Sequence, residues 1–296
     1  MCLPECITWM TVGLAESVAI VTLNLCTIIV LIRNRNLRKR STYLVLNLAV
    51  SDMLAGGFAA YVLFYVPGVI CNIWKWHSNV HLAEYILITI FLLFPSTSLI
   101  NIAMIALERV HATFRPLRHR VLKKRVYGLL IAKVWVASGL GLTISVLLEH
   151  FKDADYNLYL RTAACLFNLL IICVSYSSIL IKFRRGAQPQ HHGAASRERK
   201  LTMALLIVTV VSLLLYLPAT LFAVLVYSGK FEMTFSVSIN LLGAHWVLVY
   251  ANSLVNPMLY AICIPEYRSA VVALFRKQPA LRNCERRVAV LPLRDM

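Results

Sequence analysis

Seven long stretches of this chain consist almost entirely of apolar residues, and short polar segments separate them. Each stretch reaches the roughly 20 residues that an α-helix needs to cross the hydrocarbon core of a bilayer. Backbone groups find no water in that core, so each stretch is predicted to be a helix. The predicted spans are Trp9–Ile32, Tyr43–Val69, Ala83–His111, Val126–Leu148, Leu158–Lys182, Leu201–Tyr227 and Phe235–Cys263. The pattern therefore predicts an all-α membrane protein, a bundle of seven transmembrane helices.

The segment after the last span has an amphipathic pattern. Between Pro265 and Lys277, the apolar residues Tyr267, Val271 and Leu274 recur at helical spacing among basic residues. This pattern predicts a short helix that lies on the membrane surface. Residues 1–277 are therefore predicted to form one membrane domain, and residues 278–296 a disordered cytoplasmic tail.

Positive charge is concentrated on one side of the predicted bundle. The chain has 30 Lys and Arg but 13 Asp and Glu, which gives a net charge of +17. Most basic residues fall in alternate connections and in the tail, at 33–40, 115–125, 182–200 and 268–294. Short basic loops stay in the cytoplasm, which predicts the N-terminus outside and the C-terminus inside. The charge therefore favours contact with anionic membrane lipids or an acidic partner rather than with nucleic acid.

Three of the eight cysteines, Cys2, Cys6 and Cys71, fall on the predicted outer side. The outside of a cell permits disulfides, so Cys71 is predicted to bond either Cys2 or Cys6, and three free thiols are the alternative. No Cys–His pattern in the sequence has the spacing of a metal site. The first apolar run is too long for a cleavable signal peptide and lacks a basic start.

Several polar residues lie inside the predicted spans. Asp52 is in the middle of the second span, where a carboxylate is costly to bury and indicates a functional position. Asn252 and Asn256 in the seventh span share one helix face, because they are four residues apart. Arg109 lies at the inner end of the third span, and Ser98 lies about three turns further out. These residues predict a polar network inside the bundle.

This order of polar residues resembles the rhodopsin-like class of G-protein-coupled receptors over nearly the whole chain. The matching positions are Asn24, Leu48-Ala49-Val50-Ser51-Asp52, Glu108-Arg109-Val110, Pro116-Leu117, Trp135, Tyr176, Pro218, Asn256-Pro257-Met258-Leu259-Tyr260 and Tyr267. The resemblance implies a receptor of the plasma membrane and not an enzyme. Such a receptor passes the signal of an extracellular small-molecule or peptide ligand to a heterotrimeric G protein.

The resemblance also implies a sodium site in the middle of the bundle. Its ligands would be Asp52, Ser98, Asn252 and Asn256, with Asn24 beside them. A sodium ion would be the bound cofactor of such a receptor, and no covalent cofactor is implied. The alternative is a polar network whose hydrogen bonds are satisfied within the bundle and hold the helices together.

A set of switch residues toward the G protein is implied in the same way. The set consists of Glu108, Arg109, Tyr176, Glu198 and Tyr260. In the class, an acid at the position of Glu198 pairs with the arginine and ties the third span to the sixth in the resting state. The alternative is that Glu198 is a solvated charge within a basic segment, since Arg197 and Arg199 flank it.

Aromatic residues mark a candidate ligand site toward the outer side. Phe91 lies eighteen residues, or about five turns, before Arg109 and so shares its helix face. Trp246 and Tyr250 are four residues apart on the seventh span, and Tyr216 approaches from the sixth. An apolar cavity with a few hydroxyls is typical of a small-molecule site. The alternative is that these aromatic side chains only pack the bundle.

The residue at position 91 bears on the ligand class. Aminergic receptors place an Asp there to pair with an ammonium group, and Phe91 cannot form that pair. The ligand is therefore predicted to resemble a lipid, a nucleoside or a short peptide rather than a biogenic amine. Two acids nearer the outer side, Glu16 and Glu84, remain able to meet a cation or a basic side chain of a peptide.

Four positions depart from the pattern of the class. Asn168 replaces the usual proline of the fifth span, Ser212 and Tyr216 replace a Phe and a Trp of the sixth, and Glu84 replaces a disulfide-bonded Cys. The short outer tail, the absent proline of the fifth span and the absent disulfide are similar to those of the melanocortin, cannabinoid, lysophospholipid and adenosine receptors. The altered residues of the fifth and sixth spans also leave open a receptor-like scaffold that does not signal. An opsin is less favoured, because Tyr250 stands where opsins carry the retinal-binding Lys.

Overall fold

The structure is a computed structural model that describes residues 3–34, 37, 42–74, 81–151, 154–185, 193–227 and 232–275. These residues form helices joined by short connections, without a strand among them. The helices are α1 (Leu3–Arg33), α2 (Thr42–Ile70), α3 (His81–Phe114), α4 (Pro116–Val121), α5 (Lys124–His150), α6 (Ala154–Arg185), α7 (Gly193–Tyr227), α8 (Phe235–Cys263) and α9 (Pro265–Phe275). Each of the seven predicted spans falls inside one helix, and the bounds of the seventh agree with those of α8.

Five of the described helices are long and apolar enough to cross a membrane by length and composition, namely α1, α2, α3, α5 and α6. Helix α8 passes the same test together with α9, which bends away from it by 96°. Helix α7 carries a shorter apolar stretch, Val210–Val226. The predicted fold class, a seven-helix membrane bundle, is confirmed.

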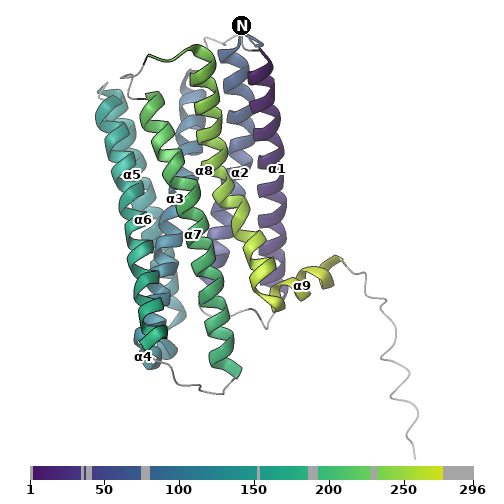
Figure 1. Cartoon of the computed structure of the whole chain (residues 1–296), viewed down its shortest axis with the longest axis vertical. Coiled ribbons are helices and arrows are strands. Elements are labelled where there is room, and N and C mark those ends of the chain that lie inside the picture. The colour runs from purple at the N-terminus through teal and green to yellow at the C-terminus, as the bar shows by residue number, and fades with distance from the viewer. Residues whose placement is uncertain are drawn as a thin grey trace, which may run out of the picture.

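The long helices lie side by side along one axis, with the N-terminus at what we term the upper end (Figure 1). At the opposite, lower end lie the short helix α4 and the crosswise helix α9 (Figure 1). Helix α3 is the most deeply enclosed of the candidate spans, with 61% of its apolar window buried, whereas α5 is the most peripheral at 11%. Helix α3 therefore lies at the centre of the bundle, where its side chains can contact several neighbouring helices.

Helix α9 is the surface helix that the amphipathic pattern predicts. Its residues Tyr267 and Ala270 are buried, and Phe275 is exposed. The Tyr267 hydroxyl lies 2.7 Å from the Thr27 hydroxyl of α1, and this hydrogen bond fastens α9 under the bundle. The predicted end of this helix at Lys277 and the predicted tail at 278–296 lie outside the described residues.

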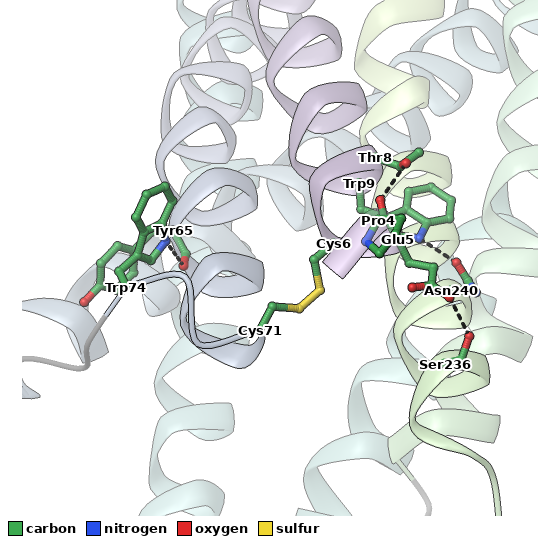
Figure 2. The surroundings of a disulfide bond; sticks show 10 residues. All are labelled: Pro4, Glu5, Cys6, Thr8, Trp9, Tyr65, Cys71, Trp74, Ser236 and Asn240. Carbon is green, nitrogen blue, oxygen red and sulfur yellow. Dashed lines mark hydrogen bonds between the residues drawn. A yellow bond between two sulfur atoms is a disulfide. The ribbon is translucent and has the colours of Figure 1, made fainter. Parts of the chain in front are cut away.

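A disulfide joins Cys6 of α1 to Cys71, which follows α2 (Figure 2). Of the two partners predicted for Cys71, the structure selects Cys6, and Cys2 lies outside the described residues. Two hydrogen bonds then connect α1 to α8: Trp9 Nε1 donates to Asn240 Oδ1 at 2.9 Å, and the Ser236 hydroxyl donates to Glu5 Oε1 at 2.9 Å (Figure 2). These contacts explain why α1 begins at Leu3 rather than at the predicted Trp9.

The disulfide generates a prediction for stability. Cys71→Ser removes the link and frees Cys6, and a bridge of this kind typically stabilises a protein by about 2–4 kcal/mol. We expect a lower thermal unfolding temperature and a Cys6 thiol that reacts with a maleimide, both measured on the purified protein. Cys173→Ser removes a free cysteine of α6 and serves as the control. An unreduced peptide map without a Cys6–Cys71 peptide would contradict the assignment.

Candidate functional site

The centre of the bundle holds a fully buried carboxylate, Asp52 of α2. Two side chains of α8 donate to it: the Ser253 hydroxyl reaches Oδ1 at 2.7 Å, and Asn256 Nδ2 reaches Oδ2 at 2.8 Å. Ser98 of α3 is fully buried beside the same carboxylate. The sequence identified Asp52, Ser98 and Asn256 but missed Ser253. Its position three residues before Asn256, on the same helix face, was the available signal.

Polar atoms around Asp52 are left unpaired within the described part of the chain. Ser98 Oγ, Asn256 Oδ1, Asn252 Nδ2 and the Tyr260 hydroxyl are buried without a hydrogen-bond partner there. An unpaired buried polar group costs about 1–3 kcal/mol, so such groups in native proteins usually meet water, an ion or a ligand. The cluster therefore has the composition of a hydrated or ion-binding site.

The residues present fit a hard cation. Carboxylate, hydroxyl and amide oxygens are the ligands that such ions prefer, and Asp52, Ser98 and Asn256 supply one of each. Asn252 differs, because its oxygen accepts from Ser212 and its amide nitrogen is the free atom. Three of the four predicted sodium ligands can thus offer an oxygen atom. The fourth, Asn252, has only its amide nitrogen unpaired, and this atom is a hydrogen-bond donor.

Asn24 lies beside this cluster and is fully engaged with backbone. Its amide nitrogen donates to the Ile20 carbonyl of α1 at 3.0 Å and to the Ser253 carbonyl of α8 at 3.1 Å. Asn24 therefore ties α1 to the helix that carries the donors to Asp52.

Ser212 of α7 occupies the position where the resembled class has an apolar aromatic residue. Its hydroxyl donates to Asn252 Oδ1 at 2.5 Å, and both residues are buried. This bond joins the sixth and seventh spans within the polar cluster. The sequence marked Ser212 as a departure but gave no partner for it.

A second charged cluster lies at the lower end of α3. Arg109 and Glu108 are buried and form an ion pair, with Arg109 Nε donating to Glu108 Oε2 at 2.5 Å. Glu108 Oε1 also accepts from the Tyr127 hydroxyl of α5 at 3.0 Å and lies 2.7 Å from His119 Nε2 of α4. Three polar side chains, one each from α3, α4 and α5, thus surround Glu108, and no sequence pattern had marked His119 or Tyr127.

The other predicted switch residues are less fully placed. Tyr176 and Tyr260 are both buried in the main apolar core, and the Tyr260 ring packs on Tyr267 with 6.1 Å between centroids. The side chain of Glu198 lies outside the described residues, although its position falls within α7. The pairing of Glu198 with Arg109 therefore stays a prediction.

The aromatic residues predicted to line a ligand site come together but pack tightly. Phe91 is 4.6 Å from Trp246 and 5.2 Å from Tyr250 between ring centroids, and the Tyr250 hydroxyl donates to the Phe91 carbonyl at 3.0 Å. The Tyr216 hydroxyl lies 3.5 Å from the Pro95 carbonyl. Phe91 and Tyr250 are almost fully enclosed. Trp246 borders an open cavity on the side of α1 and α2.

The remaining member of the predicted ligand site, Glu84, lies near the upper end of α3, and its side chain is outside the described residues. Phe91, Tyr216, Trp246 and Tyr250 thus form a plug beneath the upper end. In this arrangement Trp246 also borders the neighbouring cavity.

The sequence pattern of the 7 transmembrane receptor (rhodopsin family) matches residues 23–260. The chain is 27% identical to the histamine H2 receptor of Canis lupus familiaris, an alignment that covers 85% of this chain and 75% of that receptor.

Two similar relatives carry the names of peptide receptors. The galanin receptor 2a of Danio rerio is 26% identical, covering 85% of this chain and 73% of the relative. The allatostatin-A receptor of Bombyx mori is 25% identical, covering 86% and 74%. None of these three is a melanocortin, cannabinoid, lysophospholipid or adenosine receptor, so the similarity to that branch stays a prediction.

The Ser212–Asn252 bond gives a prediction for the site. Ser212→Ala removes the donor and leaves a buried amide oxygen without it, so we expect the unfolding free energy to fall by about 1 kcal/mol. Thermal unfolding of purified receptor measures the change, and Ser212→Thr should largely restore stability. Ser178→Ala is the matched control, because that hydroxyl bonds only the Val174 carbonyl of its own helix among the contacts described. Equal losses in both alanine variants would count against an interhelical role.

Proposed function

Because the chain belongs to the rhodopsin family of seven-transmembrane receptors, we propose that it transmits an extracellular ligand signal to heterotrimeric G proteins. Members of this family are signalling receptors rather than enzymes, and the chain is a multi-pass protein of the plasma membrane. We place the upper end outside the cell and the lower end, with the C-terminal segment, in the cytoplasm. The concentration of Lys and Arg in the lower connections supports this orientation.

The observation that carries the proposal is the buried arginine at the lower end of α3. Arg109 is 5% exposed, and Glu108 holds it by an ion pair within the bundle. His119 and Tyr127 fix Glu108 in turn, so the arginine is closed off from the cytoplasm in this arrangement. A G protein needs a cavity at this end, and movement of α7 away from α3 would open one.

Ligand binding acts on this end by shifting an equilibrium between closed and open states. A ligand can shift that equilibrium only by its difference in affinity for the two states. Helix α8 connects the predicted ligand site to the centre of the bundle. In its upper half, Trp246 and Tyr250 contact Phe91 of α3. One to two turns below, Ser253 and Asn256 of the same helix donate to Asp52.

The ligand is proposed to resemble a lipid, a nucleoside or a short peptide. Phe91 lies buried where a helix-three acid would be needed for a biogenic amine, and its carbonyl is already bonded to Tyr250. The relatives include both kinds: five histamine H2 receptors are named for an amine, whereas two galanin receptors and one allatostatin-A receptor are named for peptides. Exposed apolar side chains on α5 and α6, such as Leu129 and Phe167, support contact with membrane lipids. We assign no surface to nucleic acid.

The alternative functions have weaker support. A scaffold that does not signal is favoured only by the departures on α6 and α7. An opsin would need a Lys at position 250, where the Tyr250 hydroxyl instead donates to the Phe91 carbonyl.

Within this function we propose a sodium ion at Asp52, Ser98 and Asn256, with Asn252 beside it. The unpaired oxygens of Ser98 and Asn256 support the assignment. A bound sodium ion would supply positive charge to the Asp52 carboxylate and so favour the state in which these three residues stay close together.

The resting lock yields a prediction for signalling. If Arg109 and Glu198 restrain α7, Glu198→Ala raises ligand-free nucleotide exchange on the G protein by about 5- to 150-fold, the usual range of coupling between sites. Arg109→Ala should abolish exchange. Radiolabelled GTP-analogue binding on membranes from expressing cells measures both. Glu232→Ala changes an exposed acid just before α8 and serves as the control, and an unchanged basal rate in well-expressed Glu198→Ala rejects the lock.

The sodium site yields a second prediction. Sodium stabilises the resting state, so raising sodium at constant ionic strength should weaken agonist binding and lower basal exchange. N-methylglucamine replaces sodium as the balancing cation. Asp52→Asn removes the charge and should abolish the dependence. Wild-type affinity that ignores sodium would favour a network that only packs the bundle.

A further inference from the structure

The short helix α4 at the lower end of the bundle is attached mainly through one histidine (Figure 1). None of its residues is buried. Leu117 and Val121 are each 76% exposed, and they lie two residues before and after His119, on the opposite side of the helix. His119 itself faces α3, where its Nε2 lies 2.7 Å from Glu108 Oε1. The position of α4 thus depends on His119 and on Leu122, which follows the helix and packs on the core.

The partners of Glu108 determine where the proton of His119 lies. Glu108 forms an ion pair with Arg109 through Oε2, so it is a carboxylate and can only accept hydrogen bonds. His119 Nε2 therefore donates to Oε1, and it carries a proton whether the imidazole is neutral or charged. A second proton adds at Nδ1. This proton changes the charge of the ring while the hydrogen bond to Glu108 is kept.

His119 is the member of this cluster that solvent reaches most easily. Its side chain is 20% exposed, whereas those of Glu108 and Arg109 are 3% and 6% exposed. Tyr127, which donates to the same carboxylate, is 1% exposed. Histidine is also the side chain whose charge ordinarily changes between about pH 5 and 8. Its charge can therefore follow the pH of the surrounding solution while its partner stays enclosed.

A proton on His119 would strengthen its contact with Glu108. The guanidinium of Arg109 pairs with Oε2 and the imidazole meets Oε1, so two cations would bind different oxygen atoms of one carboxylate. With a neutral imidazole the charges of Glu108 and Arg109 balance each other. Charges attract more strongly in an enclosed site than in water, and the imidazolium would touch the carboxylate directly.

Other charged or titratable groups near His119 come from α3, α4 and α5. On α3, the His111 ring lies 5.9 Å from the His119 ring between centroids. The basic side chains on and around α4 and at the start of α5 are all exposed, namely Arg115, Arg118, Arg120, Lys123, Lys124 and Arg125. Salt screens the repulsion between exposed charges, but it screens the enclosed contact with Glu108 much less. Attraction by Glu108 therefore dominates.

We propose that His119 is a positioning residue whose positive charge holds Glu108 and Arg109 in the closed lower end, so that acidification of the cytoplasm lowers ligand-free signalling. Opening releases Arg109 and breaks up the cluster around Glu108. The closed state thus offers the imidazolium a carboxylate that the open state withdraws. It binds the proton more tightly, and a fall in pH shifts the equilibrium toward it. One proton is linked, so the shift is at most about tenfold per pH unit.

This regulation rests on the proposed function, and its first test therefore contains no G protein. Amide hydrogen exchange of residues 115–127 in the full-length receptor in lipid nanodiscs measures how often α4 leaves the bundle. His119→Gln keeps a hydrogen-bond donor but cannot take the charge. Dividing the rate of the variant by the wild-type rate at the same pH cancels the intrinsic pH dependence of exchange. We expect this ratio to rise about three- to tenfold between pH 8 and pH 6.

His111→Gln is the matched control, because it makes the same substitution on a neighbouring ring, and its ratio should be equal at both pH values. If His119→Gln fails to fold, Glu108→Gln decides the matter. That variant removes the carboxylate and keeps the imidazole, so its ratio should also rise on acidification. A ratio for the decisive variant that is independent of pH, or a rise produced by His111→Gln as well, overturns the proposal.

The second test measures ligand-free nucleotide exchange on the G protein in membranes from expressing cells. Relative to His119→Gln at the same pH, wild-type exchange should fall about three- to tenfold between pH 8 and pH 6. Tyr127→Phe removes an uncharged donor from the same carboxylate. It should raise exchange at every pH and keep the wild-type pH dependence, which separates the charge of His119 from a purely structural contact.

The two tests separate failure of this proposal from failure of the proposed function. Hydrogen exchange that depends on the His119 charge, together with no nucleotide exchange in any variant at any pH, contradicts the proposed function alone. Nucleotide exchange whose pH dependence is the same in wild type and His119→Gln contradicts the role of His119 and leaves the receptor function standing.

Discussion

The fold is organised around a carboxylate that the membrane cannot solvate. Asp52 is fully buried at the centre of the bundle, where the surrounding bilayer offers no water to an unpaired polar group. Its two donors both come from α8, and Asn24 bonds the backbone of one of them. These contacts require α1, α2 and α8 to keep one register. The disulfide and the Trp9–Asn240 bond join the same three helices at their upper ends and are consistent with that register. One helix, α8, thus carries polar contacts from the top of the bundle to its centre.

The sequence predicted the helices well because the bilayer dictates their length and composition. Each apolar stretch forms one helix, and the differences lie at the helix ends. Helix α1, for example, begins at Leu3 rather than at Trp9, and the added segment contains the disulfide-bonded Cys6. Asp52, Ser98 and Asn256 were found for the same reason, since a polar residue in such a stretch stands out. His119 and Tyr127 could not be found, because their partner Glu108 lies on another helix and only the tertiary arrangement brings them together. Periodicity also could not decide whether Phe91 and Tyr250 line a cavity or fill one.

Two of the four departures from the family pattern, Ser212 and Tyr216, have a common character in the structure. Ser212 and Tyr216 stand on α7 where apolar or indole side chains are usual, and each places a hydroxyl on a neighbouring helix. Hydrogen bonds thereby join α7 to its neighbouring helices at positions where the family usually relies on apolar packing. The Ser212–Asn252 bond and the Tyr216–Pro95 bond thus fix the position of α7 relative to α8 and α3.

Adjacent residues of α8 connect the cavity between α1, α2 and α8 to α7. Trp246 borders the cavity and contacts Phe91, whereas His245 faces α7, with its Nδ1 2.8 Å from the Ala219 carbonyl. Ala219 follows Pro218, whose missing N–H weakens the helix at that point. Successive residues of a helix move together, so any displacement of Trp246 would also move His245 against the weak point of α7. Through this pair of residues, α8 couples the cavity side of the bundle to α7.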